Sequence, residues 1–140
     1  MSECLTFEYQ VPGDDFTRAG EASSSVKNKL KMMGVDSGAI RRVAIAMYEG
    51  EINMVIHAGG GAIKVMVTDD NIRIILADTG PGIPDVEKAM QLGYSTAPEE
   101  VRSLGFGAGM GLPNMKKYSD NMQIDTEVRV GTTVTMDIHL

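Results

Sequence analysis

The stretch "RRVAIAMYEGEINMVIHA", residues 41–58, decides the fold. Apolar side chains cover most of its helical circumference, and a helix of that kind is buried in the core of a domain. Asp36 or Ser37 is placed to cap its start, and the glycines at 59–61 are predicted to end it near Ala58. A buried helix of this length needs other elements to cover it.

The segments on either side of this helix predict a sheet and further helices. Runs that alternate apolar and polar residues, or are rich in β-branched residues, predict strands. Antiparallel hairpins and helices segregated in this way favour an α+β fold, a two-layer sandwich with a mixed, mostly antiparallel sheet and helices on one face. We expect strands at 5–11, 62–68, 72–78, 122–128 and 132–140, and helices at 15–33, 85–92 and 112–118.

Composition narrows the class of protein. The 140 residues predict a single domain, 1–140, and the net charge of −6 argues against a broad nucleic-acid surface. Cys4 is the only cysteine, so no internal disulfide is expected. No apolar stretch approaches the roughly 20 residues that cross a bilayer, and the N-terminus lacks a signal-peptide pattern. We therefore expect a cytoplasmic protein without membrane contact.

The buried helix carries a polar stripe. Glu49, Asn53 and His57 recur every four residues and share one face, whereas Glu51 points away from it. Each buried polar group left without a partner costs about 1–3 kcal/mol. Either the stripe is an internal hydrogen-bonded ladder, or it faces a ligand. In the second case Glu49 can deprotonate a nucleophile and Asn53 can offer its oxygen to Mg²⁺.

A second feature is "ADTGPGIPD", residues 77–85, where Asp78 closes an apolar strand. A tight turn accounts for Gly80, Gly82 and the prolines. It does not account for a carboxylate at the end of a buried run, where an unpaired charge is costly. A carboxylate in this position can accept a hydrogen bond from the exocyclic amine of a nucleobase.

The third feature is "GFGAGMGL", residues 105–112, in which glycine occupies every second position. A flexible linker is one explanation, and a backbone cradle for phosphate at a helix start is the other. The dinucleotide pattern G-x-G-x-x-G fails here because its last glycine falls on Met110 or Leu112. The pattern G-x-x-x-x-G-K-[ST] is absent from the sequence, so any phosphate site belongs to another type.

Taken in order, four segments resemble the ATP-binding boxes of the GHKL superfamily of gyrase, Hsp90, histidine-kinase catalytic domains and anti-sigma-factor serine kinases. They are "EGEINMVIH" (49–57), "DTGPG" (78–82), "GAGMGL" (107–112) and "GTTV" (131–134). The resemblance implies the Bergerat ATP-binding fold, in agreement with the α+β prediction. Two features depart from the family pattern: Gly50 stands where alanine is common, and the glycines after the helix are unusual.

The resemblance also implies a role for each matching residue. Asp78 is expected to receive the adenine amino group, with Gly82 and Thr133 assisting through a water molecule. Glu49 is expected to be the general base, and Asn53 to hold the Mg²⁺ that bridges the phosphates of ATP. Further nucleotide contacts are expected from Gly80, Ser95, Thr96, Arg102, Gly107, Gly109, Gly111 and Leu112.

Within the superfamily the sequence most resembles the stand-alone anti-sigma and switch-kinase branch. The resemblance implies an Mg²⁺-ATP-dependent serine/threonine kinase that phosphorylates a STAS-type antagonist. The alternative is a nucleotide-gated module that sequesters a sigma factor with little kinase activity, and a slow free-standing ATPase is a third option. Homodimer formation stays open, and no direct nucleic-acid partner is expected.

Overall fold

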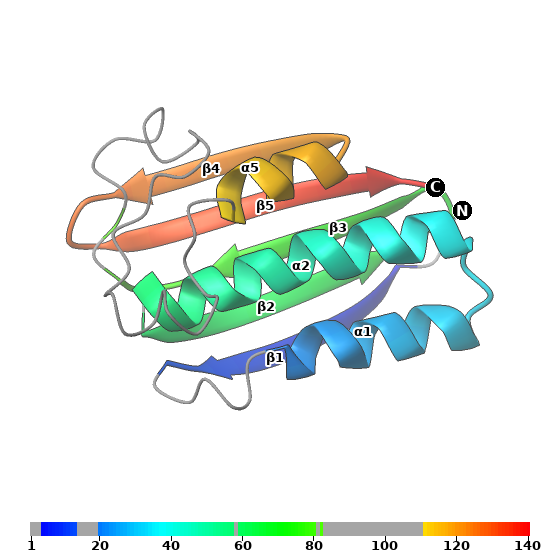
Figure 1. Cartoon of the computed structure of the whole chain (residues 1–140), viewed down its shortest axis with the longest axis horizontal. Coiled ribbons are helices and arrows are strands. Elements are labelled where there is room, and N and C mark those ends of the chain that lie inside the picture. Colours follow the sequence, from blue (N-terminus) through cyan, green and yellow to red (C-terminus); the bar gives the residue numbers. More distant parts are fainter. Residues whose placement is uncertain (1–3, 14–19, 58, 81, 83–110) are drawn as a thin grey trace.

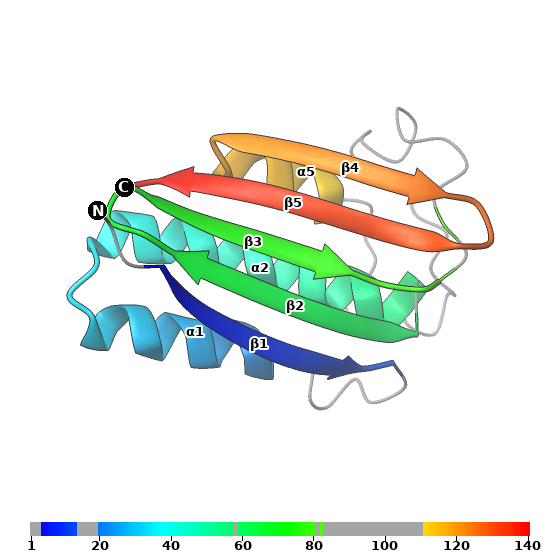
Figure 2. The same ribbon diagram turned by 180° about the vertical axis from the view of Figure 1, so that it is seen from behind.

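A computed structural model of the chain describes residues 4–13, 20–57, 59–80, 82 and 111–140. Its strands form one five-stranded sheet in the order β1-β2-β3-β5-β4, with antiparallel pairing throughout. The three described helices all lie on one face of this sheet (Figures 1 and 2). The elements are β1 (Leu5–Pro12), α1 (Glu21–Met32), α2 (Ser37–His57), β2 (Gly60–Val67), β3 (Asn71–Ala77), α5 (Gly111–Tyr118), β4 (Asn121–Glu127) and β5 (Gly131–His139). The predicted two-layer α+β sandwich is confirmed, and the described strands are all antiparallel where a mixed sheet was predicted.

The core lies between α2 and the sheet. Alternation along β3 turns Ile72 and Ile74 toward the helices, where both are fully buried, and leaves Arg73 exposed on the opposite face. From α2, Val43 and Met47 are also fully buried in the same cluster. The helix over residues 41–58 is therefore the covering element that its composition predicts.

Helix ends follow the predicted signals with one exception. Asp36 caps α2, since its Oδ2 accepts a hydrogen bond of 3.2 Å from the Ala39 N–H. Gly34 follows the end of α1, and the Val35 N–H returns to the Leu30 carbonyl at 3.1 Å. The start predicted for α1 at residue 15 is wrong, because Gly20 has a left-handed φ of 98° and the helix begins at Glu21.

The glycines after α2 also differ from expectation. Gly60 and Gly61 belong to β2, where they pair with Pro12 and Val11 of β1, so they begin a strand as well as ending a helix. The helix predicted over 85–92 lies outside the described residues. No helix in the described ranges is both long and apolar enough to cross a membrane.

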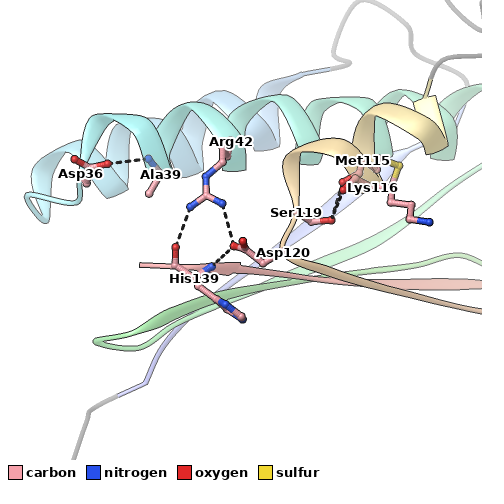
Figure 3. A network of polar contacts seen from close by, with 8 residues as sticks. All are labelled: Asp36, Ala39, Arg42, Met115, Lys116, Ser119, Asp120 and His139. Atoms are coloured by element: carbon pink, nitrogen blue, oxygen red, sulfur yellow. Dashed lines mark hydrogen bonds and ion pairs between the residues drawn. The ribbon is translucent and has the colours of Figure 1, made fainter.

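A polar network fixes the N-terminal half of α2 to the sheet (Figure 3). Arg42 donates to Asp120 Oδ2 and to the His139 carbonyl, both at 2.9 Å. The His139 N–H donates to the same carboxylate at 2.7 Å. This backbone hydrogen bond, with help from Arg42, lowers the pKa of Asp120. The network therefore anchors α2 at the end remote from its polar stripe.

An ion pair on the open face of the sheet gives the fold a pH dependence. Arg73 Nε donates to Asp137 Oδ1 at 2.8 Å, and Asn71 Nδ2 donates to the same oxygen at 3.1 Å. The hydrogen bond from Arg73 is the main reason that the pKa of Asp137 lies below its usual 3.8. A depressed folded-state pKa gives stability that is present above the unfolded value and lost as the pH falls through the folded value.

We expect Asp137→Asn to lower the free energy of unfolding by about 1 kcal/mol at neutral pH, since Arg73 is half-exposed and the pair is partly screened. The difference from wild type is expected to shrink in acid, as the pH falls through the depressed pKa of Asp137 and the native carboxyl takes up a proton. Urea unfolding at neutral pH and in acid measures this. An equal difference at both would show that the charge of Asp137 contributes nothing.

Candidate nucleotide site

Asp78 follows directly after β3, and backbone groups fix its carboxylate. Its Oδ1 accepts hydrogen bonds from the Gly80 N–H at 2.9 Å and the Thr132 N–H at 3.1 Å. The Asp78 N–H in turn donates to the Thr132 carbonyl at 2.9 Å. Both donors from the described residues bind Oδ1, so among these residues Oδ2 is the oxygen left to accept a hydrogen bond from a ligand.

Tight backbone packing surrounds this loop. Gly82 has a φ of 80°, and a Cβ there would lie 2.5 Å from the Glu127 carbonyl oxygen. At Gly131 a Cβ would lie 2.2 Å from the carbonyl oxygen of Asp78. Both positions require glycine, because a side chain would push the β4–β5 turn away from the Asp78 loop.

Thr132, which the sequence analysis did not select, lies against Asp78. Its side chain is buried, and its hydroxyl shares a 2.8 Å hydrogen bond with that of Thr126. Thr133, which the sequence analysis selected, pairs with Ala77, and strand alternation turns its side chain to the open face of the sheet. Val134, two residues after Thr132, is buried, so the alternation of the strand places the Thr132 side chain on the same inward face.

Glu49 and Asn53 lie half-buried on α2, and both contact α5. Asn114 Nδ2 donates to Glu49 Oε1 at 3.4 Å, and Asn53 Nδ2 approaches the Met115 sulfur at 4.0 Å. These partners lie on another helix, so the contacts differ from a ladder along α2. The side chain of His57 lies outside the described part of the chain.

Gly50 brings three elements together beside Glu49. A Cβ at this position would lie 2.5 Å from Leu76 Cδ2 of β3 and 3.1 Å from Met115 Cε of α5. The bare backbone therefore lets β3 and α5 both contact α2 at this turn. This close approach accounts for glycine where the family commonly has alanine, and it sets α5 against Glu49.

Glu51 points away from this stripe, as predicted, and it has a role that the sequence analysis missed. Glu51 is 2% exposed, and its carboxylate lies at the start of α1. Negative charge is favourable at a helix N-terminus, where backbone N–H groups lack partners. The carboxylate accepts hydrogen bonds from Gly20 N at 2.8 Å, Ala22 N at 3.3 Å, Ser23 N at 3.1 Å and Ser23 Oγ at 2.7 Å.

Replacing Glu51 with alanine is expected to lower the free energy of unfolding by about 3 kcal/mol, because it leaves several buried donors at the start of α1 without an acceptor. Glu51→Gln keeps one acceptor oxygen and should cost about half as much. Urea unfolding followed by circular dichroism tests both variants. An alanine variant within about 1 kcal/mol of wild type would mean that water replaces the carboxylate.

The other predicted site residues divide into two groups. Gly111 is the first residue of α5, and the Leu112 side chain next to it is buried with the core. The helix predicted to follow the glycine-rich segment therefore begins at Gly111. The remaining predicted residues lie outside the described ranges: Ser95, Thr96, Arg102, Gly107 and Gly109.

An aspartate held at the end of β3, together with a glutamate and an asparagine four residues apart on the covering helix, is the arrangement expected of a nucleotide-binding domain of the GHKL type. Residues 38–140 match the family described as histidine kinase-, DNA gyrase B-, and HSP90-like ATPases. The chain belongs to this ATP-binding family, and its resemblance to the anti-sigma and switch-kinase branch is confirmed by the relatives that follow.

Two relatives represent the branch. The chain is 33% identical over 142 residues to an anti-sigma F factor of Geobacillus kaustophilus, an alignment covering 97% of this chain and 90% of the relative. It is 31% identical over 112 residues to the serine/threonine-protein kinase RsbT of Bacillus subtilis, covering 77% and 78% respectively. One relative is thus named as an anti-sigma factor and the other as a serine/threonine-protein kinase.

A solved structure supports the fold. The crystal structure of the RsbU and RsbW domains of a Mycobacterium tuberculosis protein superimposes with a TM-score of 0.66 at 17% sequence identity. The match covers 96% of this chain and 32% of that chain, so this chain spans about a third of the other protein. At this identity the likeness establishes the fold alone.

Proposed function

We propose that this protein is a serine/threonine protein kinase of the switch type, which transfers the γ-phosphate of ATP to a hydroxyl of a STAS-type partner. The observation that carries the proposal is the carboxylate of Asp78: two backbone N–H groups hold its Oδ1, and no donor in the described part of the chain binds its Oδ2. The kinase name of the Bacillus subtilis relative supports the choice of reaction.

In this proposal Asp78 Oδ2 accepts a hydrogen bond from the adenine amino group. Gly80 and Gly82 shape the loop, and Thr132 takes the position beside the carboxylate that the sequence analysis gave to Thr133. The glycine-rich segment and Arg102 would contact the phosphates, with Ser95, Thr96, Gly107, Gly109, Gly111 and Leu112 as further nucleotide contacts.

The residues present fit a magnesium ion. The NH₂ group of Asn53 points to the Met115 sulfur, so the amide oxygen is the atom that can face a cation. Mg²⁺ prefers oxygen ligands and is usually completed by phosphates and water, so one protein oxygen is a suitable contribution. When bound, the ion offsets phosphate charge, which matters in a protein of net charge −6.

Glu49 is proposed as the general base. The hydrogen bond from Asn114 orients its carboxylate, which accepts the proton from the partner's hydroxyl. The hydroxyl oxygen then forms a bond to the γ-phosphorus, the bond from that phosphorus to the β–γ bridging oxygen breaks, and ADP leaves. The protein itself forms no covalent bond in this in-line transfer.

The test is transfer of labelled γ-phosphate from ATP to a purified STAS-type protein. We expect a phosphorylated serine or threonine on that protein, and no label when EDTA removes divalent cations. Wild-type protein that binds ATP and labels no protein would remove the kinase assignment.

The anti-sigma F names of several relatives favour one alternative, a module that sequesters a sigma factor. That function predicts ATP-dependent capture of a purified sigma factor without label transfer. Running both assays on the same sample separates the two functions, because only the kinase changes the covalent state of its partner.

A further inference from the structure

A groove of about 1000 Å³ lies between α1 and α2. Ser24, Asn28 and Met32 line it from α1, where their four-residue spacing places them in one row. Ile45 and Tyr48 line it from α2. Glu51 fixes the α1 N-terminus against α2, so the groove is formed before any partner binds.

The groove exposes apolar side chains that the fold does not use. Met32 is 88% exposed and Tyr48 is 40% exposed, and the half-buried Ile45 lines the same groove and lies outside the core cluster. Exposed apolar groups gathered in a groove with a polar rim are typical of protein interaction sites. The occupant must therefore present at least one apolar side chain.

The charged side chains differ along the length of the groove. Glu21 and Glu49 lie at one end, and Lys27 lies about 9 Å farther along α1 and is exposed. The neighbouring Lys29 is directed elsewhere, since its Nζ donates to the Tyr9 hydroxyl at 3.0 Å. A partner segment that suits this pattern carries a neutral hydroxyl at the glutamate end and a carboxylate at Lys27.

Glu49 connects the groove to the proposed chemistry. It lines the end of the groove, and on its other side it receives the hydrogen bond from Asn114 of α5. A hydroxyl that approaches along the groove therefore meets the proposed general base at this end.

We infer that the α1–α2 groove is the docking surface of the phosphoacceptor protein. Its occupant is a segment with a serine or threonine at Glu49, an apolar side chain against Ile45 and Tyr48, and an acidic residue at Lys27. This inference rests on the proposed function, because it names the surface through which that function receives its substrate.

The test measures steady-state transfer to the STAS-type protein labelled in the assay above. Tyr48→Ala and Lys27→Glu are expected to raise the KM for that protein at least tenfold, with the KM for ATP within twofold of wild type. Lys31→Glu is the matched control, since it makes the same charge change one turn along α1 and outside the groove lining. An unchanged KM for the protein substrate in both groove variants overturns the inference and leaves the kinase assignment intact.

A photocrosslink gives a readout independent of turnover. With p-benzoylphenylalanine in place of Tyr48 we expect a covalent adduct with the purified acceptor, and none with the same group in place of Met33, which is equally exposed and outside the groove lining. An adduct between two copies of this chain, or no adduct, contradicts the inference. If wild type labels no protein, the proposed function fails first and the inference falls with it.

Discussion

Glu49→Gln is expected to lower the rate of phosphoryl transfer by about 10²–10⁴-fold, the usual contribution of a general base. Glutamine keeps the size of the side chain and can still accept the hydrogen bond from Asn114. It cannot accept the proton of the attacking hydroxyl. Single-turnover transfer to the STAS-type protein measures the rate. The Kd for ATP should stay within about twofold of wild type, because Glu49 is not one of the proposed contacts of the adenine ring.

Glu51→Gln is the matched control for this experiment. It makes the same chemical change two residues away, at a side chain that contacts α1 instead of α5. We expect it to reduce stability and to leave the rate per folded molecule near that of wild type. A Glu49→Gln protein that retains more than about a tenth of wild-type turnover would show that another group takes the proton.

Asp78→Asn is expected to weaken ATP binding by about a hundredfold. Asparagine has one oxygen, whereas the site needs two acceptors, one for the backbone N–H groups of Gly80 and Thr132 and one for adenine. Whichever way the amide turns, an NH₂ group faces a donor, and an unmatched buried donor costs about 1–3 kcal/mol.

Asp125→Asn controls for the loss of charge, because Asp125 is exposed on β4 and pairs with Thr133. Its Kd for ATP should equal that of wild type. Displacement of a fluorescent ATP analogue measures all three proteins. An Asp78→Asn variant that binds as tightly as Asp125→Asn would contradict the adenine assignment.

The parts of the fold that periodicity controls were predictable. Apolar and polar residues alternate in the hairpins at 62–78 and 122–140. This alternation does not depend on which elements cover the sheet, because one face of the sheet must be apolar in any case. The start of α2 was predictable for a local reason, because Asp36 needs only its own helix to act as a cap. Helical spacing alone predicts that Glu49 and Asn53 share one face of α2, and both side chains contact α5.

The parts that depend on tertiary contacts were not predictable. Glu51 caps a helix that begins 30 residues earlier, and only the packing of α1 on α2 brings its carboxylate to Ser23. The contact of Thr132 with Asp78 joins β5 to the loop after β3, although the alternation with Val134 already indicated which of the two threonines faces the helices. The α1 start depends on the backbone conformation of Gly20, a residue equally common within flexible loops.

Isothermal titration of the wild-type protein with Mg²⁺-ATP tests the central claim most directly. We expect one nucleotide to bind per chain, with affinity that falls when EDTA removes the metal, because amide and backbone groups must then hold the phosphates alone against a net charge of −6. Absence of a binding isotherm for folded protein would contradict the nucleotide site, and with it the kinase and its docking groove.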